Sequence, residues 1–181
     1  EEMMNVMKND TVKGKTIVVS GSGNVAIYAT EKATQLGGKV VALSDSNGYI
    51  YDPNGINLDV VKQIKEVERG RIKEYVNRVE GATYTEGCKG IWTIKCDIAL
   101  PCATQNEIDE ESAKILVANG TKVVAEGANM PSTPEAIAVF QKNGLLFGPA
   151  KAANAGGVAT SGLETNWNHW RARTTGTWFC H

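Results

Sequence analysis

The chain has 181 residues, of which 42% are hydrophobic and 22% are charged; this is the average composition of a folded globular protein and excludes disordered and fibrous classes. Its 19 basic and 20 acidic residues are interspersed and give a formal net charge of −1, so we expect no binding to nucleic acid or to an anionic membrane. No apolar run approaches the roughly 20 residues of a membrane span, and no signal peptide precedes the first expected strand, which favours a cytoplasmic protein. The four cysteines lack the paired spacing of a zinc site, so no metal is expected.

Residues 1–10 carry methionines at helical spacing and end in the turn-forming pair Asn9 and Asp10. We therefore expect residues 1–12 to be the end of an incoming helix. Because the first residue is Glu1 rather than methionine, we also expect the chain to belong to a longer protein.

Residues 15–45 follow the plan of a dinucleotide-binding βαβ unit. Residues 15–20 are apolar and β-branched, as in a strand buried on both faces of a parallel sheet, and a glycine-rich turn follows. In the next helix we expect a stripe of Val25, Ala29, Ala33 and Leu36 to face the sheet. The alternative is an ordinary strand–helix turn that binds no nucleotide. The residues expected to contact the dinucleotide in this turn are Gly21, Ser22, Gly23, Asn24 and Val25.

A second apolar run, residues 40–43, ends at Ser44, Asp45 and Ser46. Asp45 follows the glycine-rich turn at close to the ~20-residue spacing at which a carboxylate binds the ribose 2′-hydroxyl of a dinucleotide. This spacing favours NAD. Residues 59–79 predict amphipathic helical structure, in two helices, whose charged face is either solvated surface or a source of cations for a 2′-phosphate. With the hydroxyls of Ser44 and Ser46, these cations lead us to expect NADP, with NAD as the alternative. The cations expected at the phosphate are Lys65 and Arg71, beside Arg69.

Three further strands are predicted at residues 97–101, 122–125 and 145–147, and they alternate with helices at 109–119 and 133–142. Residues 80–95 are expected to hold one or two short strands. Each later strand ends in a polar loop, and the carboxyl ends of parallel strands meet at the edge of the sheet where ligands bind. The alternation predicts an α/β, doubly wound, Rossmann-like dinucleotide-binding domain over residues 13–164.

Four runs of residues resemble the glutamate dehydrogenase family, particularly its hexameric bacterial type. They are SGSGNVA at 20–26, DIALPCATQNEID at 97–109, EGANMP at 126–131 and KAANAGGVATSGLE at 151–164. The resemblance implies the C-terminal coenzyme-binding domain of an enzyme that converts L-glutamate, NADP and water reversibly into 2-oxoglutarate, ammonia and NADPH. It also implies a parent homohexamer.

The resemblance implies roles for residues on the later loops. Ala103 and Thr104 would line the nicotinamide side, Asn129 would reach the nicotinamide ribose, and Asn154 would contact the nicotinamide end. Val158 would shape the substrate pocket, where the Ser161 hydroxyl would bind a substrate carboxylate. The alternatives are turn-capping roles for the two asparagines and a helix-packing role for Ser161.

The lysines and the aspartate that carry the family's chemistry belong to an N-terminal domain that is absent from this sequence. We therefore expect no catalytic residue here and no turnover by the chain alone. Two alternatives stay open, a leucine, phenylalanine or valine dehydrogenase and a non-catalytic dinucleotide-sensing module. Residues 165–181 match nothing in the family pattern, and we assign this tail no fold.

Overall fold

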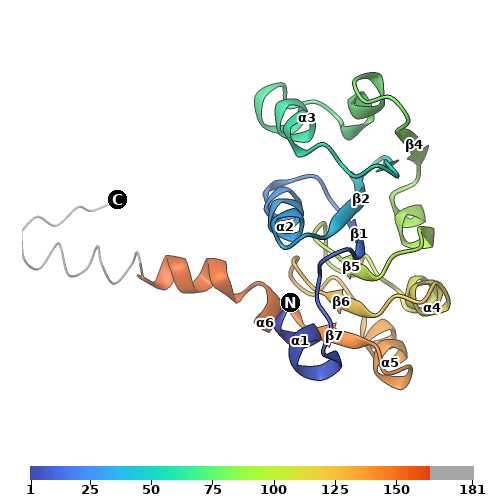
Figure 1. Cartoon of the computed structure of the whole chain (residues 1–181), viewed down its shortest axis with the longest axis vertical. Helices are drawn as coiled ribbons and strands as arrows, with labels where there is room; N and C mark the ends of the chain where they lie inside the picture. The colour runs from blue at the N-terminus through green and yellow to red at the C-terminus, as the bar shows by residue number, and fades with distance from the viewer. Residues whose placement is uncertain (164–181) are drawn as a thin grey trace, which may run out of the picture.

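The structure is a computed structural model that describes residues 1–163. Within these residues it contains a seven-stranded sheet in the order β4-β3-β2-β1-β5-β6-β7 (Figure 1). The neighbouring strands in the run β2-β1-β5-β6-β7 are parallel. β3 and β4 extend the sheet beyond β2 as antiparallel strands. The strands are β1 (Thr16–Val19), β2 (Lys39–Ser44), β3 (Gly48–Tyr51), β4 (Thr83–Glu86), β5 (Ile98–Leu100), β6 (Val123–Ala125) and β7 (Leu146–Gly148).

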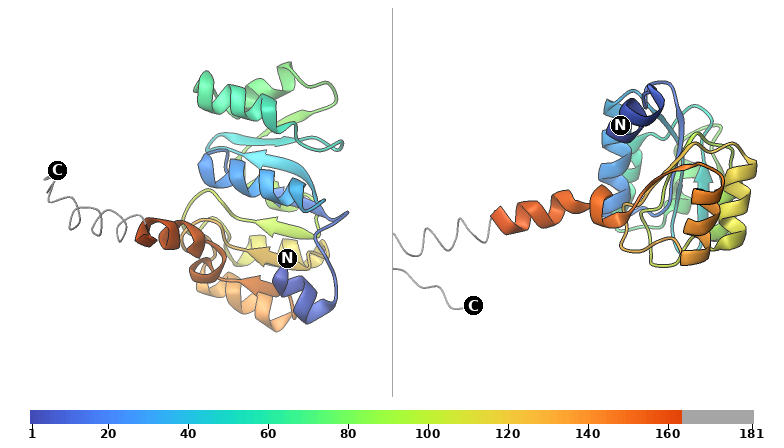
Figure 2. Two further views of the ribbon diagram at one scale, coloured as in Figure 1. Left: turned by 60° about the vertical axis from the view of Figure 1, so that its left-hand side comes forward. Right: turned by 90° about the horizontal axis from the view of Figure 1, so that it is seen from below.

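Helices cover both faces of the sheet (Figure 2). One apolar cluster lies between the sheet and α1, α2 and α3, and the other lies between the sheet and α4, α5 and the 3₁₀ helix η3. In β1, Ile17 and Val19 belong to the first cluster and Val18 to the second, as the two-residue period of a strand requires. This arrangement confirms the predicted doubly wound α/β class. The helices on the two faces are α1 (Glu2–Lys8), α2 (Asn24–Gln35), α3 (Leu58–Lys62), η3 (Cys88–Thr93), α4 (Glu110–Ala118) and α5 (Pro134–Lys142).

Two helix starts follow directly from the sequence. The Asp109 side chain accepts the Ser112 N–H at 2.9 Å and caps α4, and the Thr133 hydroxyl accepts the Ala136 N–H at 3.3 Å and caps α5. Pro134 occupies the first turn of α5, where its missing N–H costs nothing. Both helices therefore begin at the predicted positions, with Asp109 and Thr133 as their caps.

The predicted buried face of α2 was right for Ala33, which is buried, and for Ala29 and Leu36, which pack against the first apolar cluster, but it was wrong for Val25. Val25 is 47% exposed, while the buried residues of the helix are Ala26, Ile27, Thr30 and Ala33. The small side chains of Ala26 and Ala33 bring the helix close to the sheet. Val25 instead faces the carboxyl edge of the sheet, where it lines a cavity.

The amphipathic residues 59–79 form three short helical segments rather than regular α-helix throughout. α3 passes into a π-helical segment, η1 (Gln63–Val67), and after Gly70 the chain forms a 3₁₀ helix, η2 (Ile72–Asn77). Arg69 has φ +53°, a left-handed conformation that no α-helix accommodates. The helix therefore ends there, and η2 continues in a new direction.

The last described segment projects from the body of the molecule (Figures 1 and 2). A short helix, α6 (Ala150–Ala153), follows β7, and helical backbone continues over residues 155–163, whose side chains are exposed. Within residues 1–163, no helix is both long and apolar enough to cross a membrane. The predicted tail at 165–181 lies outside the described residues.

Candidate dinucleotide-binding site

Two adjoining cavities form a groove along the carboxyl edge of the parallel strands. The first has a volume of about 690 Å³ and lies between the ends of β1, β2 and β5; the second, of about 670 Å³, lies between the ends of β5 and β6 and the helix after β7. They share Val25 and residues 102–105. Predicted site residues that line the first are Gly21, Ser22, Gly23, Asn24, Val25, Ser44, Asp45, Ser46, Ala103 and Thr104, and those that line the second are Val25, Ala103, Thr104, Asn129, Asn154, Val158 and Ser161.

The glycine turn after β1 leaves room for an anionic group at the start of α2. Gly21 has φ +87°, and a Cβ there would lie 3.1 Å from the Cys102 carbonyl oxygen, so a side chain would be strained. Gly23 is the N-cap of α2, and a Cβ on it would meet no atom within 4 Å. No side chain of the described residues caps this helix. Its first N–H groups and its dipole therefore suit the pyrophosphate of a dinucleotide.

Two serines hold the loops of the first cavity in place. The Ser44 hydroxyl is only 2% exposed and accepts the Gly21 N–H at 2.8 Å. The Ser20 hydroxyl accepts the Cys102 N–H at 2.9 Å and links the ends of β1 and β5. Of the two serines expected at a 2′-phosphate, Ser46 is exposed and Ser44 is buried, although both line the first cavity.

Asp45 is engaged by the backbone around it. One carboxylate oxygen accepts the N–H groups of Asn47 at 2.8 Å and Gly48 at 3.2 Å, and the other accepts the Ile72 N–H at 3.2 Å. The carboxylate thereby fixes the turn into β3 and attaches the start of η2 to it. These bonds leave it less able to accept a ribose hydroxyl than the sequence suggested.

The two predicted cations differ in where they lie. Arg71 donates from Nη1 to the Ser46 hydroxyl at 3.0 Å, so its guanidinium stands beside the end of β2. Lys65 donates from Nζ to the Gly70 carbonyl at 3.1 Å and does not line the first cavity. The structure thus brings Arg71, but not Lys65, to the neighbourhood of Ser46.

At the second cavity, side chains from two distant segments meet. Asn154 donates from Nδ2 to Asn129 Oδ1 at 3.0 Å and to the Gly127 carbonyl at 3.3 Å. A Cβ on Gly127 would lie 2.5 Å from the Cys102 sulfur, so this loop packs closely against the end of β5. The asparagines, which the resemblance assigned to one end of the coenzyme, are therefore neighbours in the fold.

Sequence reasoning missed two acids that hold these loops. Glu107 is half-buried and accepts the Ala103 N–H at 3.1 Å; burial raises the pKa of its carboxyl, although hydrogen bonds from Ser20 and the loop backbone oppose the shift. Glu126 is 3% exposed and accepts two backbone N–H groups. An acid after an apolar strand is usually exposed, so the sequence carried no signal that these two are enclosed.

The predicted buried thiols are confirmed at Cys96 and Cys102. Burial raises the pKa of Cys102 to about 12. Since Cys102 lines both cavities of the groove, its thiol stays neutral there and supplies neither a base nor a nucleophile at neutral pH.

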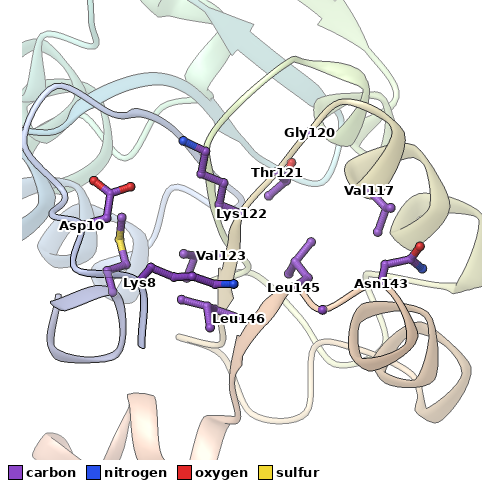
Figure 3. Close-up of a pocket in the computed structure, with 12 residues that line it drawn as sticks. Lys8, Asp10, Val117, Gly120, Thr121, Lys122, Val123, Asn143, Leu145 and Leu146 are labelled. Carbon is purple, nitrogen blue, oxygen red and sulfur yellow. The ribbon is translucent and has the colours of Figure 1, made fainter. Parts of the chain in front are cut away.

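A further cavity, of about 470 Å³, lies at the opposite edge of the sheet (Figure 3). It is formed by α1, by the ends of α4 and α5, and by the amino ends of β6 and β7. Its Asp10 is paired with Lys15 at 2.9 Å, and Lys122 lies 3.7 Å from Asp97. Parallel sheets bind ligands at the carboxyl edge, so the groove rather than this cavity is the candidate site.

A family model described as Glutamate/Leucine/Phenylalanine/Valine dehydrogenase matches residues 1–177. The chain belongs to this dehydrogenase family. It is 54% identical over 178 residues to an NAD(P)-specific glutamate dehydrogenase of Xylanibacter ruminicola, covering 97% of this chain and 39% of that protein. It is 57% identical over 160 residues to an NADP-specific glutamate dehydrogenase of Haemophilus influenzae, covering 87% of this chain and 35% of that protein.

Among solved structures, the crystal structure of glutamate dehydrogenase from Plasmodium falciparum is similar to this fold. It superposes with a TM-score of 0.87 at 48% sequence identity, covering 93% of this chain and 37% of that one. The 181-residue chain therefore spans less than two fifths of the length of each of these relatives.

Proposed function

We propose that the chain is the coenzyme-binding part of an NADP-dependent glutamate dehydrogenase. The whole enzyme would convert L-glutamate, NADP and water reversibly into 2-oxoglutarate, ammonia and NADPH, in the cytoplasm and as a homohexamer. One observation carries the proposal: the glycine turn at Gly21 and the pair Asn129 and Asn154 lie at the two ends of one groove. An extended dinucleotide needs a turn for its pyrophosphate and polar side chains for its nicotinamide end, and the groove offers these in that order.

At the adenosine end, the residues present suit a dinucleotide with a 2′-phosphate. Asp45 is held by three backbone N–H groups, which reduces its capacity to accept a ribose hydroxyl. Arg71 and Ser46 offer a guanidinium and a hydroxyl next to it. The name NADP-specific of the Haemophilus influenzae relative supports the same preference.

At the other end, the residues present suit a nicotinamide ring and a carboxylic acid substrate. Asn129 and Asn154 present amides, Ser161 lines the same cavity, and Val158 adds an apolar wall. Neutral donors and acceptors orient a ring and a carboxylate without adding charge. Bound there, NADP would accept a hydride from the substrate's Cα.

The second cavity also explains why the chain alone should be inactive. The side chains that line it include no carboxylate, lysine or histidine within the described residues, and the Cys102 thiol is held neutral by its raised pKa. Deamination needs a base and cationic partners for two carboxylates, and the residues that line this second cavity supply neither. These groups must come from a part of the enzyme outside this sequence.

The test uses the 181-residue chain as it is. Titration with NADPH, followed by nucleotide fluorescence, should show saturable binding, and glutamate-dependent reduction of NADP should be undetectable. Turnover that survives repeated purification would contradict the assignment of chemistry to another domain, and absence of NADPH and NADH binding would contradict the whole proposal.

A chimera separates this proposal from the other amino-acid dehydrogenases. In it, residues 1–163 replace the corresponding segment of the Xylanibacter ruminicola relative, and activity is compared with glutamate, leucine, phenylalanine and valine. The proposal expects glutamate to be preferred. The dinucleotide-sensing alternative is tested by reading the flanking coding sequence: a start codon immediately before the Glu1 codon, with no upstream domain, would favour the sensor.

A further inference from the structure

A buried carboxylate stands behind the second cavity without a cationic partner among the described residues. Glu126 follows β6 directly and is 3% exposed. Its Oε1 accepts the Ser132 N–H at 3.2 Å, and its Oε2 accepts the Ala150 N–H at 2.8 Å. A buried charge is expensive unless each oxygen is hydrogen-bonded, and these two bonds meet that need with backbone groups alone.

The two N–H groups belong to the two walls of the cavity. Ser132 ends the loop after β6, and this loop holds Asn129. Ala150 is the first residue of α6, and Asn154 follows that helix. One carboxylate therefore connects the two segments whose asparagines meet at 3.0 Å.

The loop is also connected to the end of β5. The carbonyls of Met130 and Pro131 accept the N–H groups of Asn106 at 3.0 Å and Ile108 at 2.9 Å. The segment that Glu126 holds thus joins all three walls of the second cavity. No described residue of the glycine turn is bonded to Glu126, which connects to the first cavity through the loop after β5 that both cavities share.

We propose that Glu126 is a positioning residue, which sets the spacing of Asn129 and Asn154 and so shapes the nicotinamide end of the groove. This inference rests on the proposed function. The positioning role requires a carboxylate, because each of the two side-chain oxygens accepts a backbone N–H group. Glutamine has nearly the same shape, but its NH₂ group would face one of the two N–H donors, and one wall would have to move.

The test compares Glu126→Gln with the unaltered 181-residue chain, using two probes. NADPH occupies the whole groove, whereas 2′,5′-ADP carries only the adenosine half with its phosphate. We expect NADPH affinity to fall about tenfold, equal to about 1.4 kcal/mol, while 2′,5′-ADP affinity changes less than about twofold. Glu135→Gln is the matched control: Glu135 is an exposed acid on α5, and its substitution should leave both affinities unchanged.

The possible outcomes are distinct. Equal loss of both ligands would show general destabilisation and overturn the positioning role, and so would an unchanged NADPH affinity. If the unaltered chain binds neither probe, the proposed function fails first and this inference with it. Should Glu126→Gln not fold, Glu126→Asp keeps the charge and both acceptors on a shorter stem. The same selective loss is expected there, and unchanged NADPH binding by that variant would overturn the proposal.

Discussion

Replacement of Arg71 by alanine should weaken NADPH binding and leave NADH binding nearly unchanged. The guanidinium stands 3.0 Å from the Ser46 hydroxyl at the end of β2, where a 2′-phosphate would lie. A hydrogen bond to a charged group contributes about 1.5–3 kcal/mol. Because Arg71 is exposed and therefore screened by salt, the lower end of this range applies, which corresponds to a loss of about tenfold in affinity.

Fluorescence titrations of both nucleotides, each at low and high ionic strength, measure this difference. The loss should shrink as salt rises, since screening already weakens the interaction in the unaltered chain. Lys142→Ala removes a cation near the end of α5 and is the control for net charge. Lys65→Ala should cost less than Arg71→Ala, because Lys65 is bonded to the Gly70 carbonyl. Equal losses for NADPH and NADH, or NADH binding as tight as NADPH in the unaltered chain, would refute the reasoning.

Three further substitutions test the site and the fold. Gly21→Ala should lower the affinity for any dinucleotide and the melting temperature, because φ +87° costs an L-residue about 1–2 kcal/mol and the new Cβ would lie 3.1 Å from the Cys102 carbonyl. Tyr75→Phe should lower the free energy of unfolding in urea by about 2–3 kcal/mol, since the Tyr75 hydroxyl donates to buried Asp52 at 3.0 Å. Desolvation raises the Tyr75 pKa to about 12, above its unfolded value of about 10. The difference in free energy of unfolding between the unaltered chain and Tyr75→Phe should therefore be complete below pH 10 and should shrink as pH rises towards 12. In the chimera, Ser161→Ala should lower kcat/KM for glutamate by a factor that corresponds to about 1.5–3 kcal/mol of lost transition-state stabilisation, without changing coenzyme affinity. Unaltered kinetics would favour a packing role.

The sequence predicted the elements whose signals are local. Strand β1, the turn at Gly21 and the start of α2 follow one another within a few residues, and each has its own pattern. The face of α2 was predicted only in part, because the buried set includes Thr30, a polar residue that the apolar stripe left out, whereas Val25 is exposed. The break after η1 depends on Arg69 adopting positive φ, which residue type alone does not signal.

The candidate site was predictable where strand ends are concerned. Parallel strands carry their following loops to one edge, so residues after β1, β2, β5 and β6 had to lie near one another. The sequence did not indicate which polar residues bind a ligand and which hold the loops. Ser44, expected at a phosphate, bonds to Gly21, and Glu126, not expected at all, bonds to two distant segments.

The two ends of the groove are therefore built in different ways. The end that we propose for adenosine is formed largely by one βαβ unit, in which Gly21 and Ser44 contact each other across adjacent strands. The other end joins residues 102–107, 126–132 and 150–161. Glu126 and Asn154 bond the second of these segments to the third, and the Asn106 N–H bonds the first to the Met130 carbonyl. A substitution in the first unit should alter its own contact with the dinucleotide, whereas loss of one buried acceptor in the second should move several contacts together. For that reason, variants that separate binding of the adenosine half from binding of the whole coenzyme should be found around the ends of β6 and β7 rather than in the glycine turn.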